Sequence, residues 1–410
     1  MEYLLDKAEQ AIEKDLCDHC LGRLFAQLGH GTTNEERGKS LNIVYAMKNS
    51  DEEDRMKIPE EPETCSVCGN IFDELDKFSD IIIEEMDEIE FDTFLVGSRN
   101  DPEIYENEEQ LWTELNLTTG ESIKHELNRE IGKLVLDKTG KDVDLEKPDV
   151  KAIIDTRFDT VEIEIAPLFV YGRYKKLSRE IPQTEWICKK CRGKGCEHCD
   201  FEGKMYPTSV EEIIGEELME MIFGEDFTLH GMGREDIDAK MLGSGRPFVM
   251  EISNPLERDV DLDELKSRVN ESDKVKIDDL RITDRDRVVE IKQGEVDKTY
   301  RVKVTFEEPI KRAKLKKVVE ELRGAKISQR TPSRVSHRRA DKVRKRIVKD
   351  IEVKSMDDDT ASINLKCEAG TYVKEFIHGD EGRTEPSLST ELGLDCVVEK
   401  LDVIDVDYQY

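Results

Sequence analysis

The sequence predicts an α+β protein of two or three domains. Its 410 residues exceed the roughly 100–200 residues that one domain typically takes. Segments with the 3.6-residue period of amphipathic helices alternate with short runs in which apolar and polar residues alternate, as in half-buried strands. Hydrophobic residues make up 37% of the chain, a low fraction that still supports several modest cores.

The charge is distributed unevenly along the chain. The formal net charge is −31, which argues against a protein that coats nucleic acid indiscriminately. Residues 311–346 nevertheless carry 15 Lys and Arg against 3 Asp and Glu. A basic segment within an acidic chain favours a focused contact with a polyanion. A solvated cationic face is the simpler alternative.

The chain lacks the sequence features of a membrane or secreted protein. No apolar run approaches the roughly 18 residues of a membrane span. The N-terminal segment has neither the basic region nor the long apolar stretch of a secretory signal. We therefore expect a cytoplasmic protein with no membrane partner, and we also expect a monomer.

Eight of the ten cysteines form four C-x-x-C pairs, which in a long cytosolic chain indicate zinc sites before disulfides. The first two pairs are separated by 44 residues, so a shared site is an inference, and buried reduced thiols are the alternative. The last two pairs fall within twelve residues with glycines between them, as in a four-cysteine zinc knuckle. Neither site looks catalytic, because four thiolates leave no open position. The expected ligands are Cys17, Cys20, Cys65 and Cys68 in one site and Cys188, Cys191, Cys196 and Cys199 in the other.

The other residues near these pairs have simpler interpretations. His198 lies between ligands, and we expect it outside the metal site because the four cysteines suffice. Cys367 and Cys396 are unpaired in the sequence, and we expect them to be buried apolar side chains.

Helices and strands in the first half of the chain are predicted from hydrophobic periodicity and from helix-capping patterns. A helix over residues 3–16 precedes the first cysteine pair, and Thr33 with Glu36 forms a capping-box pattern that opens a helix to about Met47. Residues 71–180 are expected to form one α+β unit. Its elements are helices near 72–88 and 121–136 and strands at 92–97, 150–155 and 161–165.

The segment 167–179 mixes aromatic and basic residues, a composition suited to base stacking and phosphate contact. Arg173 and Lys175 are its candidate RNA-binding residues. A half-buried strand with solvated basic side chains explains the same pattern equally well.

The second half continues the alternation of helices and strands. Ser209 and Glu212 form a capping-box pattern at the start of a helix over 208–223. Further strands are expected at 248–252, 287–291 and 299–306, and further helices near 256–275 and 311–322.

A loop rich in arginine follows the last of these helices. Pro332 and small polar residues mark residues 328–341 as a loop, so its arginines are expected to be exposed and to contact RNA phosphates. The candidate RNA-binding residues there are Arg330, Arg334, Arg338 and Arg339.

The segment Gly233–Phe248 holds the main candidate for catalysis. Arg234 precedes Asp236 by two residues on a glycine-bounded loop, and a guanidinium can hold a carboxylate ionised. That is one way to prepare an aspartate as a nucleophile. Taken alone, the pattern is more simply a surface turn with a structural ion pair. Asp238 is the alternative nucleophile.

The remaining candidates are two tyrosines and a lysine. Tyr300 begins an apolar strand face, where it is either a core residue or a platform for a base. Tyr372 and Lys374 follow a glycine turn and share one side if the segment is extended. Loops for nucleoside triphosphates or dinucleotides and hydrolase motifs are missing from the sequence. A reaction on RNA that uses one carboxylate and no organic cofactor fits this inventory.

Taken together, these segments resemble the archaeal tRNA pseudouridine synthase Pus-ten family, over nearly the whole chain. The resemblance implies an N-terminal zinc-binding region (1–70), a THUMP-type RNA-binding domain (71–180) and a C-terminal pseudouridine synthase domain (185–410). The catalytic domain is expected to be a mixed, mainly antiparallel sheet flanked by helices, with an inserted four-cysteine zinc knuckle (188–199). The motifs that carry the resemblance are the first two cysteine pairs, Pro167–Arg179, Gly233–Phe248, Arg330–Asp341 and Gly370–Phe376.

The resemblance also implies a reaction and roles for residues. Uridines 54 and 55 in the TψC loop of tRNA would be isomerised to pseudouridine, with structural zinc and no organic cofactor. Asp236 would be the nucleophile, attacking carbon 6 of the base or carbon 1 of the ribose, with Arg234 as its partner. Tyr300 would pack against the target base. Tyr372, Val373 and Lys374 would form a second pocket strand, with Leu401 as a further apolar wall.

Two departures and two alternatives remain. Some family members place Arg where this chain has Lys240 and Ile where it has Val373, which affects the detail of the pocket. Another THUMP-type tRNA-modifying enzyme would need a methyl-donor or ATP motif. A non-catalytic zinc-containing tRNA-binding or chaperone protein, with Asp236 structural, is the second alternative.

Overall fold

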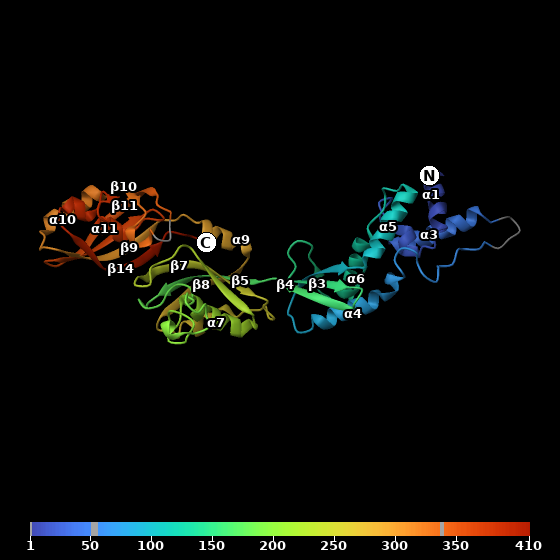
Figure 1. The fold of residues 1–410 in the computed structure, drawn as a ribbon, viewed down its shortest axis with the longest axis horizontal. Coiled ribbons are helices and arrows are strands. Elements are labelled where there is room, and N and C mark those ends of the chain that lie inside the picture. The colour runs from blue at the N-terminus through green and yellow to red at the C-terminus, as the bar shows by residue number, and fades with distance from the viewer. Residues whose placement is uncertain (1, 51–55, 337–339) are drawn as a thin grey trace. The chain divides into compact units, whose positions relative to one another are not determined.

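The structure, a computed structural model, describes residues 2–50, 56–336 and 340–410. The chain divides between Ala166 and Pro167 into two compact units (Figure 1). Each unit has its own sheet. No helix among the described residues combines the length and the apolarity that a membrane crossing requires.

The first unit begins with a helical region. As expected, Thr33 caps the helix α3 (Asn34–Lys48). Its hydroxyl oxygen accepts from the amide of Glu36 at 3.1 Å, and the Glu36 carboxylate accepts from the amide of Thr33 at 2.9 Å. The other helices here are α1 (Glu2–Ile12), α2 (Asp18–Arg23), the 3₁₀ turn η1 (Ile71–Glu74) and α5 (Pro102–Leu115).

A four-stranded sheet follows in the first unit, with strand order β2-β1-β3-β4. The strand β1 pairs in parallel with β2 and β3, and β4 pairs antiparallel with β3. Helices α4 and α6 pack against each other and against the sheet, with Ile82, Ile131 and Phe94 buried between them. The elements are β1 (Thr93–Arg99), β2 (Asp142–Val143), β3 (Val150–Asp155), β4 (Thr160–Ile165), α4 (Leu75–Glu85) and α6 (Ile123–Thr139).

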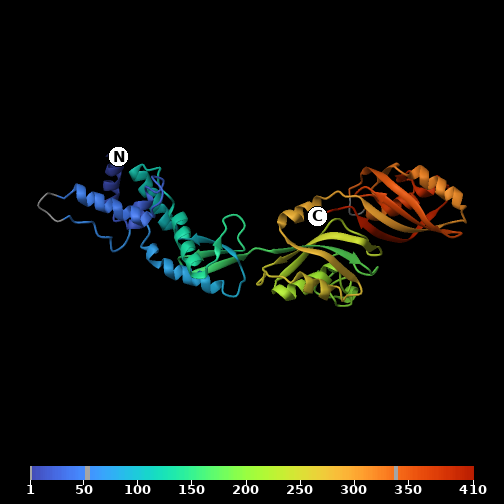
Figure 2. The same cartoon turned by 180° about the vertical axis from the view of Figure 1, so that it is seen from behind.

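The second unit is built on a ten-stranded sheet (Figure 2). Its order is β13-β10-β11-β12-β9-β14-β7-β5-β8, and β6 also pairs with β7. Among the described strands of this sheet, only β7 and β14 pair in parallel. The prediction of a mixed, mainly antiparallel sheet is therefore confirmed. The strands are β5 (Leu168–Lys176), β6 (Asp226–Gly231), β7 (Lys240–Ser253), β8 (Val275–Thr283), β9 (Lys298–Phe306), β10 (Lys326–Arg330), β11 (Val343–Met356), β12 (Thr360–Cys367), β13 (Thr384–Glu385) and β14 (Cys396–Val406).

Helices cover this sheet over two hydrophobic cores. One core lies under α7, α8 and α9, and the other under α10, α11 and α12. Tyr300 on β9 packs against both cores, so the strand carries it to the junction between them. The helices are α7 (Val210–Ile222), α8 (Leu262–Val269), α9 (Arg285–Gln293), α10 (Arg312–Leu322), α11 (Val373–His378) and α12 (Leu388–Leu392).

Four expectations about elements are wrong. Residues 328–330, expected to begin the arginine-rich loop, are the end of the strand β10 and pair with β11. The segment 287–291 is part of the helix α9, because Asp284 caps its first amides and Val288 and Ile291 bury one helical face. Residues 373 and 374 begin the helix α11 and are not extended. The strand β5, expected within the domain 71–180, pairs with β7 and β8 and therefore belongs to the second unit.

Candidate active site

A cavity of about 690 Å³ opens in the second unit. Its walls come from the loop 233–239 between β6 and β7, the strands β9 and β14, the 3₁₀ turn η3 (Ser333–Val335) and the start of α11. The cavity collects the residues that the sequence singled out in segments far apart along the chain. They are Arg234, Asp236, Tyr300, Arg334, Tyr372, Val373, Lys374 and Leu401.

A buried ion pair between Glu235 and Arg246 fixes the loop 233–239 to the sheet. The carboxylate of Glu235 accepts from Arg246 Nε at 2.8 Å and from the Tyr174 hydroxyl at 2.9 and 3.0 Å. Arg246 also donates through Nη1 to the carbonyl of Met232 at 2.8 Å. Both charged side chains are 1% exposed, so loss of either partner would leave an uncompensated buried charge. This pair makes the loop a fixed platform.

Lys176 holds the same loop through its backbone. Its ammonium donates to the carbonyls of Ile181 at 3.0 Å, Asp236 at 3.3 Å and Ile237 at 2.8 Å. The residue has no exposed surface. Burial lowers the pKa of Lys176 to about 8. Two of its three acceptors are carbonyls of the loop 233–239, so this buried lysine positions the main chain that carries Asp236.

The carboxylate of Asp236 faces the cavity beside two cations. Its Oδ2 lies 3.5 Å from Arg334 Nη1 and 3.4 Å from Lys374 Nζ. The expected pairing with Arg234 is wrong. The Arg234 guanidinium lies 5.4 Å from the ring of Trp186 instead, because the loop carries it to the rim of the cavity.

Lys374 and Arg334 are themselves held by other carboxylates. Lys374 donates to the two oxygens of Asp238 at 3.1 and 2.8 Å. Burial alone would raise the pKa of Asp238, but Lys374 holds that pKa below its usual value. Arg334 Nε donates to the buried Glu375 at 2.7 Å. Asp238 therefore has the close contact with Lys374, whereas the Asp236 carboxylate makes only longer ion pairs.

Tyr300 and Leu401 form an aromatic and apolar wall. Tyr300 pairs across the sheet with Val403, and Leu401 lies two residues before Val403 on β14. All three residues line the cavity. Within the part of the chain that is described, the Tyr300 hydroxyl has no hydrogen bond. Burial raises the pKa of the Tyr300 phenol, so this phenol keeps its proton at neutral pH.

Tyr372 lies at the start of α11, where a buried glutamine holds its backbone. Gln329 Oε1 accepts from the amide of Tyr372 at 2.9 Å, and Gln329 Nε2 donates to the carbonyl of Tyr372 at 2.9 Å. The following helical turn buries Val373 and leaves Tyr372 and Lys374 half-exposed on the cavity. The predicted residues therefore meet in the cavity, although the expected strand is a helix.

Two of the other predicted RNA-binding residues, Arg330 and Arg173, have partners within the protein. Arg330 is exposed and paired with Asp341. Arg173 donates to the carbonyls of Ser244, Gly245, Val406 and Tyr408, which engages its whole guanidinium within the fold.

Three basic residues of that set remain. Lys175 is half-buried and lies outside the main cavity. Arg338 and Arg339 lie outside the described residues.

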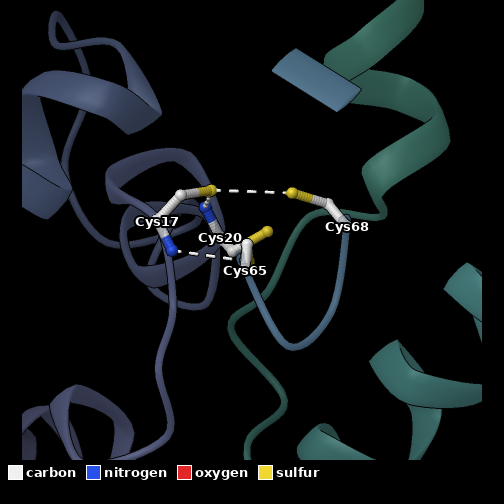
Figure 3. Close-up of side chains that lie close together, drawn as sticks. All are labelled: Cys17, Cys20, Cys65 and Cys68. Atoms are coloured by element: carbon white, nitrogen blue, oxygen red, sulfur yellow. Dashed lines mark hydrogen bonds between the residues drawn. The ribbon is translucent and has the colours of Figure 1, made fainter. Parts of the chain in front are cut away.

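The first two cysteine pairs meet in one cluster in the first unit (Figure 3). Cys17 caps α2, which contains Cys20, and the loop before η1 supplies Cys65 and Cys68. The four sulfurs lie within 4.8 Å of one another, and those of Cys17 and Cys68 are 3.7 Å apart. Tetrahedral zinc with Zn–S bonds of about 2.3 Å places its sulfurs about 3.8 Å apart. The cluster therefore fits a metal ion of this kind.

The last two pairs form a second cluster in the second unit. The sulfur of Cys196 lies 3.9 Å from that of Cys188 and 3.8 Å from that of Cys199, which fits the same geometry. His198 is exposed and outside the cluster. Cys367 and Cys396 are buried, as expected, and burial raises the pKa of Cys396 to about 12.

Functional residues that the sequence reasoning missed are Glu235, Arg246, Lys176 and Gln329. Each is buried and acts on backbone or on another side chain, so only the folded structure reveals it. The alternation in β5 held one signal, since Lys176 lies on the buried face that also carries Tyr174.

Comparisons with known proteins identify the family of this chain. Residues 169–407 match the family described as "Pus10, C-terminal", and residues 78–155 match "Pus10 THUMP domain, archaeal". A relative from Methanothrix thermoacetophila is 44% identical over 95% of this chain and 91% of its own. A relative from Methanopyrus kandleri is 40% identical over 98% of both chains.

Among solved structures, one from a Cbf5-Nop10-Gar1 complex is 19% identical, with a TM-score of 0.31, and covers 48% of this chain and 44% of that chain. The relatives match this chain over most of its length at 40% identity and above, and the chain belongs to the Pus10 family.

Proposed function

We propose that the protein is a tRNA pseudouridine synthase that isomerises uridines 54 and 55 in the TψC loop. Both relatives named above are described as "tRNA pseudouridine synthase Pus10". The observation that carries the proposal is the cavity, in which the carboxylate of Asp236 lies beside the cations of Arg334 and Lys374 and two tyrosines contribute to the lining. A non-catalytic tRNA-binding protein would not need this combination.

The reaction begins with extrusion of the target uridine from its stack, which costs a few kcal/mol. Tyr300 and Tyr372 offer aromatic surface that offsets part of this cost. Leu401 and Val403 supply apolar contacts on the same side as Tyr300. The cavity therefore accepts a flat, flipped-out base.

Asp236 then acts as the nucleophile. Its carboxylate attacks carbon 6 of the base or carbon 1 of the ribose, and the glycosidic bond from nitrogen 1 breaks. The base turns and carbon 5 bonds to carbon 1 of the ribose, and the bond between the Asp236 oxygen and the substrate breaks. Carbon 5 then loses its proton and nitrogen 1 gains one, so the carboxylate is regenerated. Product and substrate contain the same atoms, so the isomerisation consumes no co-substrate and, in this proposal, uses no organic cofactor.

Three side chains assist Asp236 in this proposal. Arg334 and Lys374 place positive charge 3.5 and 3.4 Å from its Oδ2, where they orient the carboxylate. Tyr300 keeps its proton and has no competing hydrogen bond among the described residues, so its hydroxyl is available for proton transfer at the base.

The remaining parts bind RNA or hold the fold. The THUMP domain would contact tRNA phosphates, together with Arg330, Arg338 and Arg339 of the second unit. The two four-cysteine clusters would hold structural zinc, because each offers four thiolates and no open position.

The experiment that tests the proposal is an assay on an unmodified tRNA transcript without any added cofactor. We expect pseudouridine at positions 54 and 55, mapped by carbodiimide modification and primer extension. Transcripts with cytidine at one of the two positions serve as controls for each site. Tight binding of the transcript without pseudouridine at either position would reject the enzyme and leave a tRNA-binding protein.

A further inference from the structure

The four-cysteine knuckle, residues 187–204, carries an unusual group of cations. Ile187 and Lys204 close the knuckle through a β-bridge. Its first turn is exposed, and four of the six residues 189–194 are basic. They are Lys189, Lys190, Arg192 and Lys194.

These four side chains have no ion pair or hydrogen bond with any residue that the structure describes. The chain has 94 Asp and Glu against 63 Lys and Arg, so a basic side chain normally finds a carboxylate, as Lys204 does with Glu212. Glu197, Asp200 and Glu202 lie in the second turn of the knuckle and do not pair with the four cations. Within the described chain, the first turn therefore presents four free positive charges.

The second turn adds an exposed aromatic ring. Phe201 is 72% exposed. Its φ of +66° lies in the left-handed region that non-glycine residues seldom adopt. The amide of Phe201 donates to the carbonyl of Cys196 at 2.9 Å, which ties the strained residue to the cluster. A ring held outward in this way is a platform on which a base can stack.

Both ends of the knuckle are anchored at the rim of the candidate active site. Trp186 precedes the knuckle, lines the cavity and lies under the guanidinium of Arg234. Tyr206 follows the knuckle and contacts the Trp186 ring edge-on at 5.5 Å. The amide of Met205 donates to the Trp186 carbonyl at 2.8 Å. The base of the knuckle therefore borders the cavity through Trp186.

We propose that the knuckle is an RNA-contact surface that binds the substrate next to the target nucleotide. Its four cations bind phosphates, and Phe201 stacks on an unpaired base. The inference rests on the proposed function, because the RNA in question is the substrate of the cavity. Unpaired cations with an exposed ring are the combination that binds single-stranded RNA.

The first test replaces all four cations, as Lys189→Gln, Lys190→Gln, Arg192→Gln and Lys194→Gln together. We expect tRNA binding to weaken by about 10-fold at physiological salt, and the slope of log Kd against log salt to fall by about 0.7 for each phosphate that is no longer neutralised. KM should rise while kcat stays near its original value, because no group in the cavity changes. Metal content equal to that of the original protein verifies that the knuckle remains folded.

The matched control removes the same number of charges from side chains that already have carboxylate partners. Lys266, Arg268, Lys303 and Lys354 are paired in this way, and all four would be replaced by Gln. Net charge is then equal in the two variants, and we expect the control to bind tRNA nearly as well as the original protein. An equal loss in both variants would overturn the inference.

A single substitution tests the aromatic ring without disturbing the backbone. Asn tolerates the left-handed conformation better than Phe, so Phe201→Asn should fold at least as stably as the original protein. We expect it to weaken tRNA binding by about 5–150-fold, since removing one stacked ring costs roughly 1–3 kcal/mol. Phe201→Trp should restore binding.

Unchanged Kd and salt slope in both the four-cation variant and Phe201→Asn would refute the knuckle as an RNA surface. Failure of the proposed function has a different signature, since the original protein would then form no pseudouridine at all. The binding measurements report on the knuckle in either case.

Discussion

Asp236 and Asp238 both contact Lys374, but they differ in how tightly they are held. Asp238 takes two hydrogen bonds from the ammonium, whereas Asp236 lies 3.4 Å away. The nucleophile proposed here is thus the less engaged carboxylate. Lys374 contacts both carboxylates, so its removal should lower the rate of the catalysed step.

Lys374→Gln should lower kcat by about 10²–10³-fold, the usual effect of removing one preorganised charged donor from a reacting group. KM for tRNA should change much less. Arg234→Gln is the matched control, since Arg234 contacts Trp186 and not Asp236, and we expect it to act mainly on KM. Steady-state kinetics on a tRNA transcript separate the two effects, and an equal loss of kcat in both variants would contradict this geometry.

Lys176 gives the site a pH dependence. Burial lowers its pKa to about 8, with Glu235 and Asp238 opposing this shift and Arg179 and Arg246 adding to it. Below this pH the ammonium has three protons for the carbonyls of Ile181, Asp236 and Ile237, and above it the neutral amine has two. We therefore expect kcat to fall as pH rises through about 8.

Unfolding does not explain that loss. The pKa of Lys176 is below the roughly 10.4 of an unfolded lysine, so the unfolded chain binds more protons between these values, and this group makes the fold more stable as pH rises there. Lys176→Met should lower kcat and remove the alkaline fall. Lys298→Met should retain the alkaline fall, because Lys298 donates to Val296 outside the loop. If Lys298→Met lost the alkaline fall in kcat and Lys176→Met retained it, the fall would be caused by Lys298 and this prediction would be wrong.

The sequence predicted the residues that line the cavity, but not the buried residues that fix these lining residues in position. Tyr300 and Lys374 come from recognisable segments, and the structure brings them together with Asp236. The pairing of Asp236 with Arg234 was wrong because a spacing of two residues says nothing about side-chain direction on an irregular loop. Glu235 could not be identified, because its role depends on Arg246 reaching it from β7.

At the scale of elements, local signals were predictable and interrupted patterns were not. The helices α3 and α7 start at the caps Thr33 and Ser209, which short-range hydrogen bonds define. The strand β11 was missed because its register shifts between Val348 and Asp350. Such a bulge breaks the period of two by which a strand is recognised.

The contact between β10 and α11 places Tyr372 in the cavity. Gln329→Leu removes the partners of the Tyr372 amide and carbonyl, and each group left unsatisfied costs about 1–3 kcal/mol. We expect a lower free energy of unfolding by urea and a lower kcat, since Tyr372 loses its fixed position. Gln293→Leu on the exposed end of α9 is the control. A variant at Gln329 as stable and active as this control would show that the clamp is unimportant.

At the scale of the whole molecule, the two units have separate cores and separate four-cysteine clusters. The cluster in the first unit joins segments that 44 residues separate. Closing such a loop with a metal stabilises the unit that contains it. The cluster in the second unit joins cysteines within one short segment, so a metal there would stabilise mainly the knuckle itself.

We expect two zinc atoms per chain by elemental analysis, and one in Cys65→Ser. Calorimetry should then show earlier unfolding of the first unit, with the transition of the second unit unchanged. Cys396→Ala should retain both metals, since Cys396 is buried outside the clusters. A wild-type protein with fewer than two zinc atoms would refute this assignment of the cysteines.

The most direct test of the account compares Asp236→Asn with Asp238→Asn on an unmodified tRNA transcript. We predict that Asp236→Asn forms no pseudouridine while its Kd for tRNA stays within about threefold of the original, under 1 kcal/mol. Asp238→Asn should still turn over, because its carboxylate only positions Lys374. Pseudouridine formed by Asp236→Asn, or a complete loss in Asp238→Asn alone, would contradict the assignment of Asp236 as the nucleophile.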